Sequence, residues 1–347
     1  MDNAPFLFVE EVVALTTEPN TEQTFNFHVL PELWQEAFEN GWKDRSRVWL
    51  TLSRCKDDWI YFLSMTKAII NDTCVHENIS GFRLEDLQRL QPNPKLLRFC
   101  NFEIDLVSDF MLNKLDEVCH QLPMPLIEFM EWVRPQVPHP AVRSPNLETC
   151  DLRHRIPSLL IRDHFDEATN QEIARIFSGF SNVDVRIESY TAAFNPLLEK
   201  HFQSDRISDL CHLTFKEDVP SAMDLIRSHL RTTNSFSNLE LNDNSPMTFA
   251  DFQLVFSAVL RMDFNRNKLE WIWRDEFRKH LIFKATFEAD ACGLIETVRA
   301  DLAEHGGNAS GEFKWKLDGD RLFIRLQVQE NNVWEVDIID YYVASRV

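Results

Sequence analysis

The chain has 347 residues, of which 55 are acidic and 36 basic, and its formal net charge is -19. A surface of this sign repels nucleic-acid phosphates and anionic lipid headgroups, and no cluster of basic residues interrupts it. We therefore expect no nucleic-acid partner and no membrane partner. A hydrophobic content of 44 % and an aromatic content of 12 % are sufficient to bury a sizeable core.

The cysteine pattern and the N-terminus indicate the cellular compartment. The seven cysteines are widely spaced and form no Cys-x-x-Cys pair, which predicts reduced thiols and no zinc site. Acidic residues stand near the N-terminus, where a signal peptide carries Lys or Arg, and no stretch reaches the ~20 apolar residues that a membrane helix requires. We expect an acidic cytoplasmic or nuclear protein.

Residues 1–45 are predicted to form a short helical head. Apolar side chains recur there at helical spacing in two stretches that flank a polar loop over 16–24. These side chains are Phe6, Val9, Val12 and Val13 in the first stretch and Leu30, Leu33, Trp34 and Phe38 in the second.

Residues 46–133 are predicted to form a connecting region of hairpin and helices. Aromatic and β-branched runs over 48–53 and 59–63 flank a polar corner and indicate a β-hairpin. Helices are predicted over 84–90 and 107–122, with a strand over 99–104 between them. Four prolines within residues 135–145 predict a linker over 134–148.

A repeated pattern dominates residues 149–280. An apolar-x-apolar step, a polar residue and, in four of five copies, an acidic residue recur at intervals of 26, 28, 26 and 32 residues, counted between positions 161, 187, 215, 241 and 273. These intervals lie in or just above the range of leucine-rich repeats. The copies are Leu159–Asp163, Val185–Ser189, Leu213–Glu217, Leu239–Asp243 and Trp271–Asp275.

An amphipathic helix is predicted after each of the first four strands. Parallel neighbours need crossover connections of this kind, so the fold class is α/β: a leucine-rich-repeat-like βα array with parallel strands. The inward residues of the helices are Ile173, Ile176, Phe177 and Phe180; Phe194, Leu197, Leu198 and Phe202; Ala222, Leu225, Ile226 and Leu230; and Phe249, Phe252, Phe256, Val259 and Leu260.

The repeat ends within the last part of the chain, residues 281–347. A strand over 280–287 and a helix over 289–304 are predicted, and Gly306-Gly307 then breaks the chain. Three strands over 313–317, 322–328 and 333–339 are predicted to form a β-meander. This meander is expected to cap the array, whose end otherwise exposes an apolar face.

Catalytic and cofactor motifs are absent from the sequence. The eight glycines form no phosphate-binding loop, no serine lies in a Gly-x-Ser-x-Gly elbow, and the eleven histidines lack metal-ligand spacing. We expect no catalytic residue, no metal and no cofactor. An enzyme whose site has no sequence motif remains an alternative, and it requires a deep pocket with clustered titratable groups.

The array presents a candidate recognition face. If the repeated apolar residues point into the core, the residues that alternate with them point outward, and these differ from copy to copy, as suits a protein-binding surface. The alternative is that this face is solvated or covered by the N-terminal half. The candidate residues are Asp184, Arg186, Glu188, His212, Thr214, Lys216, Asn238, Glu240, Asn242, Glu270, Ile272 and Arg274.

The head resembles a degenerate F-box. The resemblance lies in a proline-led apolar helix over 5–15, followed by a segment over 25–37 that contains a tryptophan. Together with the array it is similar in plan to the expanded F-box-like families of nematodes. That resemblance implies a docking surface for a Skp-type linker, formed or supported by Pro5, Phe6, Val9, Val12, Val13, Leu30 and Trp34.

The resemblance implies a protein-recognition adaptor, the substrate-selecting subunit of a cullin-based ubiquitin ligase. Residues 1–45 depart from the F-box pattern in three ways. The opening helix lacks the Leu-Pro start, the loop over 16–24 is long, and Leu30-Pro31-Glu32-Leu33 offers a second possible start of the motif. The alternative is a ligase-independent inhibitor, antidote or scaffold that uses the same array face, with the head as a structural cap.

Overall fold

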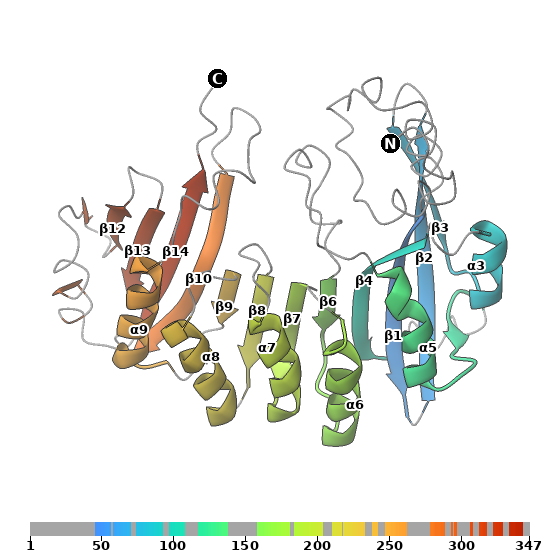
Figure 1. Ribbon diagram of the computed structural model, residues 1–347, viewed down its shortest axis with the longest axis horizontal. Helices are drawn as coiled ribbons and strands as arrows, with labels where there is room; N and C mark the ends of the chain where they lie inside the picture. The colour runs from blue at the N-terminus through green and yellow to red at the C-terminus, as the bar shows by residue number, and fades with distance from the viewer. Residues whose placement is uncertain are drawn as a thin grey trace, which may run out of the picture. The chain divides into compact units, whose positions relative to one another are not determined.

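The computed structural model describes part of the chain, which falls into two compact units. The first unit comprises residues 1–164 and 180–183, and the second comprises residues 165–179 and 184–347. Each is an α/β unit with parallel and antiparallel strands (Figure 1). The described residues are 46–56, 58–70, 74–92, 97–107, 117–137, 158–180, 184–203, 210–216, 218–232, 238–241, 247–261, 278–288, 293, 295–296, 306–307, 312–317, 322–328 and 333–342.

Two predicted segments fall largely outside this set. The helical head, residues 1–45, lies wholly outside it, and the predicted linker is described only over residues 134–137. A short 3-10 helix, Arg134–Gln136, occupies that described part.

The first unit contains a sheet with the strand order β3-β2-β1-β4-β6, and β5 pairs with β2. The predicted hairpin is confirmed, because β1 and β2 pair antiparallel around a turn in which Lys56 has a φ of 54°. Strands β1, β4 and β6 run parallel. The strands are β1 (Ser46–Cys55), β2 (Asp58–Ile70), β3 (Cys74–Ser80), β4 (Leu97–Leu106), β5 (His120–Gln121) and β6 (Ser158–Ile161).

The helices of the first unit are α3 (Leu84–Leu90) and α5 (Leu126–Val133). The first confirms the prediction over 84–90. The predicted helix over 107–122 is wrong at its C-terminal end, because β5 pairs there with Ile60 and Tyr61 of β2. This strand pairing overrides the local helical pattern at residues 120–121, and residues 108–116 of the predicted helix lie outside the described residues. Helix α5 follows Pro125.

Helix α5 packs against the sheet of the first unit. Its apolar face is buried, and the ring of Trp132 meets the ring of Phe99 on β4 edge-on, with 6.1 Å between centroids. The rings of Phe129 and Tyr61 are stacked at 6.3 Å. Aromatic pairs of this kind stabilise a core beyond the area that they bury.

The second unit contains a sheet with the strand order β7-β8-β9-β10-β14-β13-β12-β11. Strands β7 to β10 run parallel, and the remaining neighbours pair antiparallel. The strands are β7 (Asp184–Tyr190), β8 (Leu210–Phe215), β9 (Asn238–Leu241), β10 (Arg278–Glu288), β11 (Gly306–Gly307), β12 (Glu312–Leu317), β13 (Leu322–Val328) and β14 (Val333–Tyr342).

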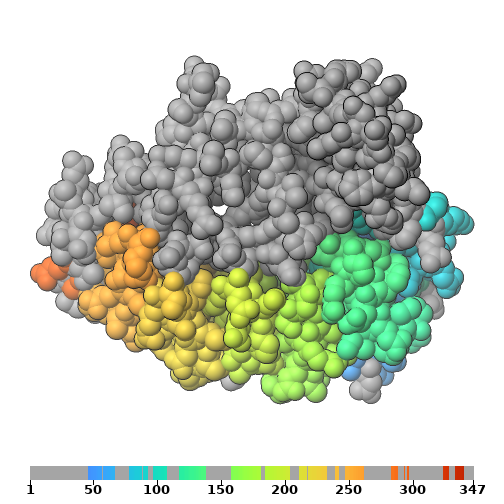
Figure 2. All heavy atoms as spheres, viewed as in Figure 1, coloured from blue at the N-terminus to red at the C-terminus, as the bar shows by residue number. Residues whose placement is uncertain are grey.

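The four predicted helices of the array are confirmed. They are α6 (Glu167–Phe177), α7 (Asn195–Phe202), which follows the 3-10 turn Ala192–Phe194, α8 (Pro220–Thr232) and α9 (Phe249–Leu260). Helices α7, α8 and α9 lie side by side on one face of the strands, and their outer surfaces adjoin (Figures 1 and 2). One predicted inward residue, Leu260, is wrong: it ends α9 and is 43 % exposed.

The repeated apolar residues face this helical layer, as predicted. Val185 and Ile187 on β7, and Leu213 and Phe215 on β8, are at most 2 % exposed. Phenylalanine fills the space between the layers. In α9, for example, the ring of Phe252 meets that of Phe287 on β10 edge-on at 5.5 Å.

The neighbour of β9 differs from the predicted one. The repeat places its fifth strand over 271–273, which lies outside the described residues, but β10 occupies the position beside β9, with Phe283 opposite Leu239. The three meander strands are confirmed, and β14 pairs with β10, so the meander extends the sheet. Gly306–Gly307, predicted as a break, is the short strand β11.

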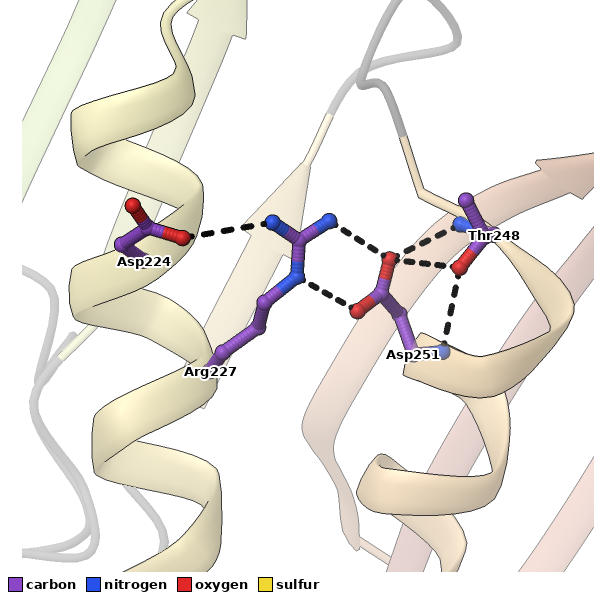
Figure 3. A network of polar contacts seen from close by, with 4 residues as sticks. All are labelled: Asp224, Arg227, Thr248 and Asp251. Carbon is purple, nitrogen blue, oxygen red and sulfur yellow. Dashed lines mark hydrogen bonds and ion pairs between the residues drawn. The ribbon is translucent and has the colours of Figure 1, made fainter.

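An arginine joins α8 to α9 (Figure 3). Arg227 on α8 donates through Nε to Asp251 Oδ1 at 2.7 Å and through a terminal nitrogen to Oδ2 at 2.9 Å. Asp251 also accepts from the backbone and hydroxyl of Thr248, which caps α9. Burial raises the pKa of Asp251, but the hydrogen bonds from Arg227 and Thr248 outweigh it and hold the pKa below its ordinary value.

We expect Arg227→Met to lower the free energy of unfolding by about 2–4 kcal/mol, because it leaves the carboxylate of Asp251 buried without its cation. The double variant Arg227→Met/Asp251→Asn should lose less than the sum of the single changes. Asp224→Asn is the matched control, since Asp224 binds the same arginine but its side chain is 76 % exposed. Urea unfolding of the native chain, the two single variants, the double variant and the control measures these losses. Additive losses in the double variant would contradict the role of the pair.

A histidine on α8 predicts an acid-sensitive stability. Burial lowers the pKa of His229 to about 4, and His201 adds to the effect. The folded chain favours the neutral ring of His229. Its contribution to the free energy of unfolding is therefore complete above pH 6.5 and is lost as the pH falls toward 4. Its size is about 3 kcal/mol.

His229→Phe keeps a flat ring against Phe202, whose centroid lies 4.3 Å away, but cannot bind a proton. We therefore expect the unfolding free energy of the variant to fall less steeply than that of the native chain between pH 6.5 and 4. Equal slopes for the two proteins in urea titrations would refute the assignment.

Candidate functional site: a charged row on the sheet of the second unit

The outward residues predicted on the repeated strands lie on the sheet face opposite the helices. On β7, Arg186 is exposed and Asp184 and Glu188 are partly exposed, whereas the residues between them are buried. On the next two strands His212, Thr214 and Glu240 are partly exposed, and Lys216, directly after β8, is exposed.

The remaining predicted residues lie outside what the structure describes. Asn238 begins β9, but its side chain is not among the described ones. The recognition-face residues Asn242, Glu270, Ile272 and Arg274 are outside the described residues, as is the whole predicted docking set Pro5, Phe6, Val9, Val12, Val13, Leu30 and Trp34.

Cross-strand pairing brings six charged or titratable residues into one line, which we call the charged row. Each residue is the direct neighbour of the next on the adjacent strand, and the line crosses β7, β8, β9, β10, β14 and β13. Direct neighbours on one face of a sheet lie about 4.5–5.5 Å apart, so their side chains interact. In order, the row is Arg186, His212, Glu240, Lys284, Asp337 and Arg325.

Ion pairs and hydrogen bonds fix several side chains of the row. His212 Nδ1 lies 3.1 Å from Glu240 Oε2, and His212 Nε2 lies 3.4 Å from Thr214 Oγ1. Lys284 Nζ lies 3.3 Å from Glu335 Oε1. Arg325 pairs with the buried carboxylate of Asp337.

The row favours an ionised Glu240. The hydrogen bond from His212 is the largest influence and lowers the pKa of Glu240. Partial burial opposes this effect, while the charges of His212, Lys284 and Arg186 reinforce it. Opposite charges on neighbouring strands thus hold one another in place while remaining in contact with solvent.

Four residues of this site were missed by sequence reasoning: Lys284, Arg325, Glu335 and Asp337. They lie on strands that were predicted, but those strands were treated as a cap and not as a continuation of the array face. A signal was present, because Lys284, Arg325 and Asp337 interrupt apolar runs at outward positions. The antiparallel pairing of β10 with β14, which aligns them, could not be derived from that alternation.

The arrangement suits binding by multiple polar contacts. Among the described side chains, no group of three or more His, Cys, Asp or Glu residues could hold a metal ion. The row offers acceptors and donors in alternation on a rigid sheet, a pattern that can match a mixed polar protein surface.

Comparison with protein-family models, with curated proteins and with solved structures found no match to this chain. Among the described residues, no helix is both long enough and apolar enough to cross a membrane.

The lowered pKa of Glu240 predicts a pH-dependent contribution to stability. A carboxyl group whose pKa is lower in the folded chain stabilises it above its ordinary pKa of 4.5, and this contribution is lost as the pH falls below that value. Glu240→Gln should lower the unfolding free energy by about 0.5–1 kcal/mol at pH 7, since the pair is partly exposed.

The difference between Glu240→Gln and the native chain should shrink between pH 5 and pH 3. Glu199→Gln, at an exposed position on α7, is the matched control and should change stability little at any pH. A constant difference between the two curves would show that packing, and not charge, causes the effect of Glu240→Gln.

Proposed function

We propose that this chain is a protein-recognition adaptor that binds its partner through the polar face of a leucine-rich-repeat-like array. The observation that carries this proposal is the charged row, in which varied, mutually oriented side chains remain accessible, apart from the buried Asp337. The side chains of His212 and Glu240 are each 26 % exposed, and those of Lys284 and Arg325 are 36 % and 31 % exposed.

The order of the side chains favours recognition of a protein over binding of a small anion. Cations and anions alternate along the row, so the face has no strong field of one sign. Charges held by their neighbours lose little conformational freedom when a partner binds, which lowers the cost of association. Complementary charges on the partner would then determine specificity and orientation.

We further propose that the head makes the chain a substrate-selecting subunit of a cullin-based ubiquitin ligase. This part of the proposal rests on the F-box-like pattern of residues 5–37. The head would dock on a Skp-type linker, and the array would present the protein to be modified. No residue of this chain would then perform catalysis.

The second candidate is a ligase-independent inhibitor, antidote or scaffold. It uses the same array face, and the head serves only as a cap. Deletion of residues 1–45 separates the two candidates: an adaptor loses its linker and keeps its partner, whereas a scaffold loses neither.

A pull-down with purified Skp-type linker tests the docking head. We expect the intact chain to bind, and we expect Phe6→Asp/Val12→Asp to abolish binding because it places two carboxylates on the apolar docking face. Circular dichroism establishes that the double variant is folded. If the intact chain does not bind the linker, the ligase proposal fails and the scaffold candidate stands.

A charge reversal tests the recognition face separately. Arg186→Glu/Lys216→Glu changes two exposed cations on this face and should reduce at least tenfold the recovery of proteins that co-purify with the intact chain. Arg175→Glu/Lys200→Glu is the matched control, since it makes the same change of charge at exposed positions on α6 and α7. Equal losses in the two variants would place binding elsewhere.

A further inference from the structure

We propose that His212 is a protonation switch that reverses the hydrogen-bond polarity of the recognition face. Its two ring nitrogens have partners of different kinds, a carboxylate of Glu240 at Nδ1 and a hydroxyl of Thr214 at Nε2. The role of this switch in partner binding rests on the proposed function, whereas the reversal itself does not.

The carboxylate determines where the neutral ring carries its hydrogen. An ionised carboxylate only accepts hydrogen bonds, so Nδ1 must donate, and Nε2 of the neutral ring is then an acceptor. The hydroxyl of Thr214 therefore donates to Nε2 in the neutral state. Glu240 remains ionised throughout mild acid, because its pKa is lowered from an ordinary value of 4.5.

Protonation changes both the charge and the direction of these bonds. A protonated imidazole donates from both nitrogens, so the hydroxyl of Thr214 must turn and accept from Nε2. Its own hydrogen is then directed away from the ring. One proton thus converts a site where the ring accepts into a site where it donates, and adds a positive charge to the row.

Histidine is the residue type in the row whose charge ordinarily changes near neutral pH. Arg186 lies opposite His212 on β7, where Asp184 and Glu188 flank it on the same face, and Glu240 lies opposite His212 on β9. Lys284 follows Glu240 on β10, and Lys216 comes directly after β8. Arginine, lysine and the carboxylate of Glu240 keep their charges between pH 5 and 8, the interval in which histidine ordinarily changes charge. Partial exposure of His212 lets protons exchange without unfolding.

Consequently the face would favour different contacts on the two sides of this interval. Protonation of the ring adds one positive charge between Arg186 and Glu240, while the charge of Lys284 is balanced by Glu335 at 3.3 Å. A partner group that donates to the hydroxyl oxygen of Thr214 is matched to the neutral ring, whereas a partner carboxylate, which can accept the outward hydrogen of that hydroxyl, is matched to the protonated ring.

Nitrogen NMR of the full ¹⁵N-labelled chain tests this switch without any partner. The signal of His212 is assigned by its loss in His212→Asn. We expect the Nδ1–H tautomer at pH 8 and hydrogens on both nitrogens at pH 5. Thr214→Val, which keeps the shape but removes the hydroxyl, should shift the Nε2 signal of His212 and leave the other histidines unchanged.

An Nε2–H tautomer at pH 8, or an unchanged ring between pH 8 and 5, would overturn the proposal. If His212→Asn does not fold, the signal that Thr214→Val displaces provides the assignment. Since no partner is present, failure of the switch leaves the recognition proposal intact. Failure of the charge-reversal experiment likewise leaves the NMR result valid.

Discussion

The fold of the second unit depends on the alternation of side chains along each strand, which places apolar residues on one face of the sheet and polar residues on the other. In β8, β9 and residues 184–188 of β7, every second side chain is buried, and the side chains between them face the other way. Burial of the apolar set, at roughly 25 cal/mol for each Å² of apolar surface, stabilises the layered unit. It also fixes the position of the polar set, because a shift of one residue would exchange the two faces. The candidate site is therefore a by-product of core formation.

The helical layer is held by interactions of a different kind. Apolar packing sets the distance between the helices and the sheet. Because it is not directional, it does little to prevent one helix from sliding along its neighbour. Arg227 with Asp251, and Arg261, which donates to the carbonyl of Leu230 at 2.7 Å, connect α8 and α9 at specific atoms. Directional bonds of this type define one arrangement among several with similar apolar burial.

Local patterns predicted much of the described architecture. Alternation identified the strands of the array and of the meander, and helical spacing identified α3 and α6 to α9, because each of these elements has one clearly apolar face. The pattern failed where pairing with a distant strand decided the conformation, as at β5, which pairs with β2. It also misplaced the neighbour of β9, since residues 271–273 and β10 both carry apolar alternation.

The polar positions of β7 to β9 were predictable for the same reason as the core. Their alignment with Lys284, Asp337 and Arg325 was not, because cross-strand register is a non-local property.

Strand β10 has parallel pairing on one edge and antiparallel pairing on the other. A strand with two such edges sets a limit on how this chain can change in length. A further strand–helix repeat can be accommodated only by insertion among the parallel strands, because beyond β10 the next position already belongs to a strand running the opposite way. An insertion between β7 and β10 would widen the proposed recognition face by one strand and separate Arg186 from Lys284, while leaving the Lys284–Asp337–Arg325 end of the row unaltered. Variants of this architecture could therefore change the side chains at one end of this face while the other end stays constant.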